Sequence, residues 1–374
     1  MNHIFPRGRR SHDDSRLRTP GMPAPPTAVT VLGRNPHHLA ATGSAPSRLA
    51  GSASSPDEPR RSVDAPERPR LCIALATRNR CDLAVQALES VFPQLEDGDE
   101  LVVVASACED DTYARLTELL ALRRHSARIV DDPIGGVSRA RNLALAHAEA
   151  PIVCFFDDDE LVDPNWIESL RTAWLHAEAD VAVIGGPIRP RWETRRPSWL
   201  RDDILYVLSL LDLGPAPQQL DQSPHSGYIW GGNMSVRRQA ALEVGGFDEL
   251  RGVRPSAPLG RGEEEHIQRR MAARGWQIWY EPSAIVHHQL PARRTTLQYF
   301  RQTFREAARG AARQGATRRR ASIRLAVSLS RFAAALVLVK RDDVARASLQ
   351  VAYAWTLLTT PRARRTGPPR PSEG

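Results

Sequence analysis

The sequence predicts an α/β protein with a mixed, mainly parallel sheet flanked by helices and followed by a C-terminal helical extension. Between residues 70 and 160, short apolar runs alternate with segments of helical periodicity, which is the pattern of βαβ units. Polar clusters follow several of these runs, at the strand ends where such sheets bind ligands. Beyond Pro291 the pattern is wholly helical and rich in Ala and Arg.

The composition indicates a globular protein. The chain has 374 residues, enough for one large domain with extensions, and 41% of them are apolar. Four cysteines lack metal-type CxxC spacing, and Cys72 and Cys154 lie in apolar runs, so we expect reduced thiols and a cytoplasmic location. The basic N-terminus has no apolar core after it, so no secretory signal is expected. No stretch reaches the roughly 18 apolar residues of a spanning helix.

The net charge of +8 is unevenly distributed. Residues 291–374 contain 18 Lys and Arg against 4 Asp and Glu, a net charge of +14, which leaves −6 on residues 1–290. A basic tail of this kind suits an anionic membrane surface, a nucleic acid or an acidic partner.

Three segments are predicted along the chain. Residues 1–69 are rich in Pro, Ser, Arg, Gly and Ala, and we expect them to be disordered. Residues 70–290 should form the α/β domain, and residues 291–374 the basic helical extension, with a disordered tail from about residue 361. The apolar stretches of this extension are compatible with interfacial helices, an oligomer contact or packing on the body.

The elements of the domain follow from apolar runs, capping residues and breakers. In the first half we expect strands at 71–76, 100–105, 128–130 and 152–156, with helices from residue 82, after 110–112 and at 139–148. In the second half we expect strands at 182–186 and 276–280, with helices from about 237 to 244 and from 263 to the glycine at 275.

The acidic turn after the run 152–156 is the strongest local signal. This run has the length and composition of a buried strand, and Asp157, Asp158 and Asp159 follow it directly. Three adjacent carboxylates repel one another, and a divalent cation with oxygen ligands would neutralise them. The alternative is a loop whose acids only mark the start of the next helix.

Four polar clusters are expected at or after the carboxyl edge of the sheet, at residues 77–80, 157–159, 263–266 and 287–288. A metal site draws acids and often a neutral imidazole from separate elements. Taken singly, the acids at 263–265 suit a helix start, His288 a packing histidine, and Arg139 and Arg141 a solvated helix face. Their joint occurrence favours a site.

Five sequence blocks, in this order, resemble the family 2 glycosyltransferases, which have the GT-A fold, over about residues 70–310. The blocks are LCIALATRNR, VVVASACEDDT, GGVSRARNLALAHAEAPIVCFFDDDE, WGGNMSVRRQAALEVGGFDE and GRGEEEHIQRRMAARGWQIWYEPSAIVHHQ. The resemblance implies a metal-dependent, inverting, hexosyltransferase-type reaction that uses a nucleotide-diphospho-sugar donor. The acceptor would be a glycan, a lipid-linked molecule or a small molecule in polysaccharide or glycoconjugate synthesis.

The resemblance also implies roles for individual residues. The expected donor-binding residues are Thr77, Arg78, Asp110, Arg139, Arg141, Asn142, Asp157 and Asp158. The residues expected beside the sugar and the acceptor are Gly232, Asn233 and Glu263. Asp159 and His288 would hold the divalent cation, Mn²⁺ or Mg²⁺, and Glu264 matches the general base.

These roles agree with the chemistry. Breaking a sugar–diphosphate bond leaves negative charge on the leaving group, which a divalent cation and arginines stabilise. A carboxylate on the opposite face can deprotonate the acceptor hydroxyl, and attack from that face inverts the anomeric centre. Base and metal ligands must therefore come from different elements, as Glu264 and Asp159 do.

Two positions depart from the family pattern. The family usually has Asp at the end of the second strand, where this chain has Ala105 and Ser106. The acidic pair that contains the candidate general base is Glu263-Glu264, where the family has a pair ending in Asp. Glu263 and Glu265 are therefore alternatives for the base.

Two other functions fit parts of the sequence. A non-catalytic nucleotide-sugar-binding module would be consistent with both departures. Nucleic-acid binding would use the basic tail, but no aromatic stacking platform accompanies it, so no specific nucleic-acid partner is expected. Basic helices with apolar stripes predict a further contact, peripheral binding at the cytoplasmic membrane face.

Overall fold

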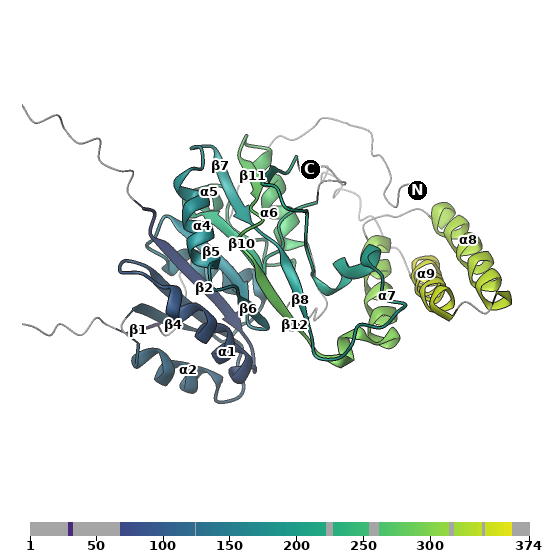
Figure 1. Ribbon diagram of the computed structural model, residues 1–374, viewed down its shortest axis with the longest axis horizontal. Coiled ribbons are helices and arrows are strands. Elements are labelled where there is room, and N and C mark those ends of the chain that lie inside the picture. The colour runs from purple at the N-terminus through teal and green to yellow at the C-terminus, as the bar shows by residue number, and fades with distance from the viewer. Residues whose placement is uncertain are drawn as a thin grey trace, which may run out of the picture.

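The computed structural model describes residues 29–32, 68–123, 125–221, 227–253, 262–313, 318–338 and 341–360. Within these ranges a large sheet has the strand order β1-β4-β3-β2-β5-β10-β7-β11-β9, and a small sheet has the order β6-β12-β8 (Figure 1). The C-terminal tail predicted to be disordered, from about residue 361, lies outside the described residues. The mixed α/β architecture with a parallel centre confirms the predicted fold class.

The large sheet is parallel across β4-β3-β2-β5, and β11 is parallel to β7. Its strands are β1 (Val29–Leu32), β2 (Leu71–Thr77), β3 (Glu100–Ser106), β4 (Ser126–Asp132), β5 (Ile152–Asp157), β7 (Val181–Gly185), β9 (Gln218–Gln219), β10 (Asn233–Arg237) and β11 (Gln277–Tyr280). Three strands run antiparallel to their neighbours: β10, β1 and β9.

Helices cover both faces of the sheet. On one face pack α1 (Cys81–Val91), α2 (Thr112–Ala121) and α4 (Trp166–Leu175), and on the other pack α3 (Val137–His147), α5 (Arg238–Glu243) and α6 (Glu263–Ala272). Short 3₁₀ helices lie at η1 (Phe92–Gln94), η2 (Asp202–Leu208) and η3 (Ala292–Thr295). Because β2, β3 and β5 are covered on both faces, their sequences are continuous apolar runs rather than alternating ones.

The small sheet brings a distant part of the chain to the acidic turn. It contains β6 (Glu160–Val162), β8 (Ile188–Trp192) and β12 (Val286–Leu290). β12 runs parallel to β8 and antiparallel to β6, in a register that places His288 opposite Glu160. This pairing carries the histidine to the residue that directly follows Asp159.

The sequence analysis did not predict β10, which inserts between β5 and β7. Its sequence, NMSVR, is short and contains two uncharged polar residues, Asn233 and Ser235, besides the terminal Arg237, so it lacks the pattern of a buried strand. Both polar residues are buried and hydrogen-bonded: Trp166 Nε1 donates to Asn233 Oδ1 (2.9 Å) and Trp174 Nε1 donates to Ser235 Oγ (2.8 Å). The strand is therefore fixed by contacts with α4.

A second strand that the sequence did not predict lies inside residues 1–69. β1 pairs antiparallel with β4 at the edge of the large sheet, with Val29 opposite Val130. Its four residues, VTVL, have high β propensity but stand alone in a Pro- and Ser-rich stretch. The domain boundary predicted at residue 70 remains a prediction.

The C-terminal extension is helical, as predicted, and consists of α7 (Leu297–Arg313), α8 (Arg318–Val337) and α9 (Arg341–Thr359). α9 lies between α7 and α8 and packs against both (Figure 1). α7 joins the body, because Phe300 is fully buried and meets the Trp199 ring edge-on with centroids 5.1 Å apart. Among the described helices, none is both long and apolar enough to cross a membrane.

Candidate active site

The parallel neighbours β2 and β5 end side by side, so their terminal residues meet. Ala76 lies opposite Asp157 in the register. The Thr77 hydroxyl donates to Asp158 Oδ2 (2.8 Å), and Arg80 Nη1 donates to Asp158 Oδ1 (2.9 Å). The middle acid of the turn thus joins the two strand ends.

The last acid of the turn, Asp159, faces the small sheet. Its Oδ2 lies 3.5 Å from His288 Nε2, 3.3 Å from Arg294 Nη1 and 3.5 Å from Arg80 Nη1. Burial opposes ionisation of this carboxyl, but the positive charges of Arg294 and Arg80 hold the pKa of Asp159 well below its usual range. Asp159 is therefore ionised at neutral pH.

The Asp159 and His288 pair fits a divalent cation in part. For metal–ligand bonds of about 2.1 Å, two neighbouring ligand atoms lie roughly 3.0–3.5 Å apart, which the 3.5 Å separation matches. Within the part of the chain that the structure describes, no group of three or more His, Cys, Asp or Glu is arranged to hold a metal ion. Any cation held here would take its remaining ligands from the substrate or from water.

The other acids of the predicted site gather around one buried arginine. Arg141 Nη1 donates to Glu263 Oε1 and to Glu264 Oε1, both at 3.3 Å, and its Nη2 lies 3.6 Å from Asp157 Oδ1. Only 5% of the Arg141 side chain is exposed. Arg141, predicted to bind the donor, thus connects the acidic turn on β5 to the candidate base at the start of α6.

Two glycines make room for this arrangement. A Cβ atom on Gly231 would overlap the Arg141 guanidinium, and one on Gly232 would overlap the Glu160 carboxylate. Glu160 is itself buried, and its Oε2 accepts a hydrogen bond from the Asp157 backbone N–H (3.0 Å). The pair of glycines therefore supports the site by its lack of side chains, rather than through a side-chain contact.

Burial changes the protonation of two acids. Burial raises the pKa of Asp158 to about 6, although Arg80 partly opposes the shift. Burial and the adjacent Glu264 raise the pKa of Glu263 to about 8. At neutral pH Glu263 is mainly protonated.

Several predicted site residues have structural partners instead. Asn142 donates to Phe247 O (2.9 Å) and accepts from Phe247 N (2.7 Å), so its amide holds the loop after α5. Asn233 begins β10, and its side-chain nitrogen donates to the carbonyls of Pro187 and Ala284. Both amides thus hold neighbouring backbone in place, and the donor role of Asn142 and the acceptor role of Asn233 stay predictions.

The remaining predicted donor residues lie apart from the acid cluster. Arg139 Nε donates to the fully buried Asp132 (2.8 Å). Asp110 accepts from Thr112 N (3.1 Å) at the start of α2, and this hydrogen bonding lowers the pKa of Asp110. Arg78 lies near the surface, 3.4 Å from Glu109.

Sequence reasoning missed three residues that the structure brings to the site: Arg80, Glu160 and Arg294. Arg80 lies in a cluster that the sequence did single out, and Glu160 follows the triple Asp directly. Arg294 offered no signal, since it is one of many arginines in a basic segment.

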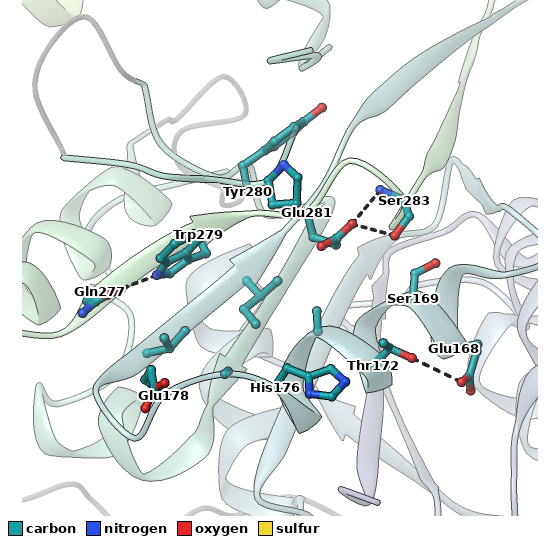
Figure 2. A pocket seen from close by; sticks show the side chains of 15 residues that line it. Glu168, Ser169, Thr172, His176, Glu178, Gln277, Trp279, Tyr280, Glu281 and Ser283 are labelled. Carbon is teal, nitrogen blue, oxygen red and sulfur yellow. Dashed lines mark hydrogen bonds between the residues drawn. The ribbon is translucent and has the colours of Figure 1, made fainter. Parts of the chain in front are cut away.

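A separate pocket of about 560 Å³ lies between α4, β7 and β11 (Figure 2). Trp279, Gln277 and Glu281 line one side of it, and Thr172 and His176 the other. None of its lining residues belongs to the predicted site. It is therefore distinct from the acid cluster.

Comparison with known proteins gives a family match. The model of "Glycosyl transferase family 2" matches residues 72–245. The glucosyl-dolichyl phosphate glucuronosyltransferase of Haloferax volcanii is 24% identical over 222 residues, which are 57% of this chain and 66% of that protein. The pre-mycofactocin glycosyltransferase of Mycobacterium tuberculosis is 31% identical over 155 residues, 41% of this chain and 30% of that protein.

Two further proteins are similar. The succinoglycan biosynthesis protein ExoM of Rhizobium meliloti is 28% identical over 169 residues, 45% of this chain and 49% of that protein. The chain thus spans between 30% and 66% of the length of these three curated relatives. A solved structure, the mannosyltransferase of Pyrobaculum calidifontis in complex with GDP-Man and Mn²⁺, has a TM-score of 0.49 at 20% identity, covering 79% of this chain and 73% of that one.

Proposed function

We propose that this chain, whose residues 72–245 match the glycosyl transferase family 2 model, is a metal-dependent, inverting glycosyltransferase. The donor is a nucleotide-diphospho-sugar, and the acceptor carries a hydroxyl group. The observation that most supports this proposal is the position of Arg141, between Asp157 on one side and Glu263 and Glu264 on the other. It holds the acidic turn and the candidate base as two halves of one site.

The metal-binding half consists of Asp159 and His288. When bound there, Mn²⁺ or Mg²⁺ offsets the charge of the diphosphate leaving group. Arg80 adds positive charge beside the turn, and Asp158 fixes the position of Arg80 through its 2.9 Å contact. Asp157, at the end of β5, lies toward the sugar and the nucleoside.

The base half consists of Glu264, supported by its neighbours. Glu264 Oε1 accepts from Arg141 Nη1 and from Gly231 N, both at 3.3 Å, which fixes the orientation of the carboxylate. Glu263 is mainly protonated at neutral pH, so it is the weaker candidate for the base. Glu264 then takes the proton of the acceptor hydroxyl as that oxygen attacks the anomeric carbon.

The names of the relatives suggest a class of acceptor. One is named for a glucosyl-dolichyl phosphate substrate, and another for succinoglycan biosynthesis. We therefore propose that this protein acts in glycoconjugate or polysaccharide synthesis, on a lipid-linked or glycan acceptor.

Donor turnover tests the proposal. Purified protein with Mn²⁺ or Mg²⁺ should release nucleoside diphosphate from at least one of a panel of UDP-, GDP- and dTDP-sugars, and EDTA should stop the release. If no donor is bound or hydrolysed, the proposal fails. Binding of a donor without transfer to any acceptor in a lysate would support a nucleotide-sugar-binding module instead.

The C-terminal extension supports a membrane contact, which we also propose. α8 exposes large apolar side chains: Ile323, Val327, Leu329, Leu336, Val337 and, just after the helix, Leu338. The α8 sequence carries five arginines and no acid. An exposed apolar face with basic residues suits an anionic bilayer surface, which would place the protein at the cytoplasmic face of the membrane.

Vesicle binding tests this contact. The full chain should sediment with phosphatidylcholine vesicles that contain phosphatidylglycerol and not with phosphatidylcholine alone. Changing Leu336 and Val337 to Glu should reduce this binding at least tenfold, because Val337 is 81% exposed on α8. Leu122→Glu is the matched control, since Leu122 is 83% exposed but lies after α2. Failure of the unmodified protein to bind anionic vesicles would reject the contact.

A further inference from the structure

Arg294 contacts both candidate metal ligands with the same atom. It belongs to η3, directly after β12, and its Nη1 lies 2.6 Å from His288 Nε2 and 3.3 Å from Asp159 Oδ2. A guanidinium only donates hydrogen bonds and keeps its charge in proteins. His288 Nε2 must therefore accept, so its lone pair points at Arg294 Nη1.

This arrangement is the one that a cation would require of the same two residues. A divalent metal binds a neutral imidazole through its lone pair and a carboxylate through an oxygen. Here the two atoms that would bind the metal, His288 Nε2 and Asp159 Oδ2, both lie next to the same guanidinium nitrogen, Arg294 Nη1. The positive charge of Arg294 therefore stands where the charge of a metal ion would stand.

The backbone of Arg294 is fixed, while its side chain has room to move. Arg294 N donates to Pro291 O (2.8 Å), and the next residue, Thr295, is buried with its hydroxyl donating to Ala292 O. The Arg294 side chain is 23% exposed, compared with 5% for Arg141. A cation entering between Asp159 and His288 would repel the guanidinium toward solvent, where the donor diphosphate would lie.

We propose that Arg294 occupies the cation position in the donor-free protein and moves onto the diphosphate of the donor when the cation binds. This inference rests on the proposed function. It makes Arg294 both a competitor of the free metal ion and a ligand of the leaving group. Metal and nucleotide would then each bind more tightly when the other is present. The diphosphate draws Arg294 away from the cation position, and the bound cation frees Arg294 to contact the diphosphate.

The two roles predict opposite changes in a single variant. In Arg294→Gln, Mn²⁺ alone should bind the full chain about tenfold more tightly, because its competitor is gone. With Mn²⁺ saturating, UDP or GDP should bind about tenfold more weakly, because one charge-assisted contact to the diphosphate is lost. Isothermal titration calorimetry of the full chain measures both affinities without any acceptor or turnover.

Arg293→Gln is the matched control. Arg293 lies in the same 3₁₀ helix and is exposed. Removing its charge should leave both affinities within about twofold of the unmodified protein, since at the exposed surface charges interact weakly. A change equal to that of Arg294→Gln would mean that only the general positive field matters, and would overturn the proposal.

The remaining outcomes separate this inference from the proposed function. If Arg294→Gln leaves both affinities unchanged, or weakens Mn²⁺ binding, Arg294 neither competes with the cation nor holds the diphosphate. If the unmodified protein binds neither UDP nor GDP in the presence of Mn²⁺, the proposed function itself fails. Circular dichroism of each variant shows whether it is folded, so that the affinities of folded proteins are compared.

Discussion

Two arginine–carboxylate clusters lie on either side of Asp157, and they differ in how tightly their arginines are enclosed. In the cluster around Glu263 and Glu264, Arg141 is 5% exposed, donates hydrogen bonds to both glutamates, and lies 5.6 Å from the centre of the Phe247 ring. In the cluster around Asp159, the Arg80 side chain is 43% exposed and that of Arg294 is 23% exposed.

This difference in exposure distinguishes arginines that are held permanently from arginines that can be displaced. An enclosed arginine that bridges buried acids cannot leave without exposing unpaired charges in a low-dielectric environment. An arginine at the edge of solvent can be replaced at small cost. We infer that Arg141 is a fixed part of the site, whereas the arginines around Asp159 are exchangeable for a metal ion and a diphosphate.

The largest loss of binding and turnover should come from changing Asp159, the acid at the centre of the cluster whose arginines can be displaced. Asp159→Asn removes the only acid that His288 and Arg294 share in the described contacts. Because the cation would lose its anionic ligand, metal-dependent binding of UDP or GDP should disappear and turnover should fall by about 1000-fold or more. Calorimetry and nucleoside diphosphate release measure the two effects, and unchanged metal-dependent binding would contradict this role for Asp159.

The next largest effect should distinguish the two glutamates that contact Arg141, because only one of them should lower kcat strongly when changed to Gln. Glu264→Gln should lower kcat by roughly 100- to 10,000-fold, because an amide cannot take the proton of the acceptor, while nucleotide affinity stays the same. Glu263→Gln should keep kcat within about tenfold at pH 7, because an amide resembles the protonated acid already present there. The reverse order of the two kcat values would identify Glu263 as the base.

Gly231→Ala measures directly how fixed Arg141 is. The new Cβ would overlap the Arg141 guanidinium, which cannot move without leaving Glu263 and Glu264. We expect a loss of about 3 kcal/mol in the free energy of unfolding, measured by urea denaturation.

The control for Gly231→Ala is a double-mutant cycle with Arg141→Ala. In that background the overlap is absent, so the added methyl group should cost less than about 1 kcal/mol. Equal costs in the two backgrounds would show that Arg141 yields easily and would remove the contrast between the clusters.

The last effect is a change in the pH dependence of stability. The folded-state pKa of Glu263, about 8, lies above the ordinary value of 4.5. Its contribution to stability is therefore fully present below pH 4.5 and is lost as the pH rises toward 8, because only the unfolded chain ionises freely in that range. Glu263→Gln lacks this loss.

The free energies of unfolding of the two proteins should consequently diverge with pH. We expect the Gln variant to gain up to about 4 kcal/mol over the unmodified protein between pH 5 and pH 8.5, with most of the gain below pH 8. Urea denaturation at a series of pH values measures the difference. A constant difference across this range would show that Glu263 ionises normally in the folded protein.

Much of the fold could be predicted because the central strands are buried on both faces. The runs that became β2, β3 and β5 are apolar throughout, and the turn at Asp157–Asp159 directly follows one of them. In contrast, β10 was missed because its polar residues, Asn233 and Ser235, are satisfied by tryptophans from α4. A single sequence does not reveal such partners, since they lie more than 60 residues away.

The amino-acid sequence alone was enough to assign the α/β class and the resemblance to family 2 glycosyltransferases, and to single out the acids and the histidine of the predicted site. Only the tertiary structure decided which arginine pairs with which acid. It assigned Arg141 to Glu263 and Glu264, Arg294 to Asp159 and His288, and Arg139 to Asp132. The physical reason is that an arginine can pair with any carboxylate in reach, and strand pairing, such as that of β12 with β6, sets which ones are in reach.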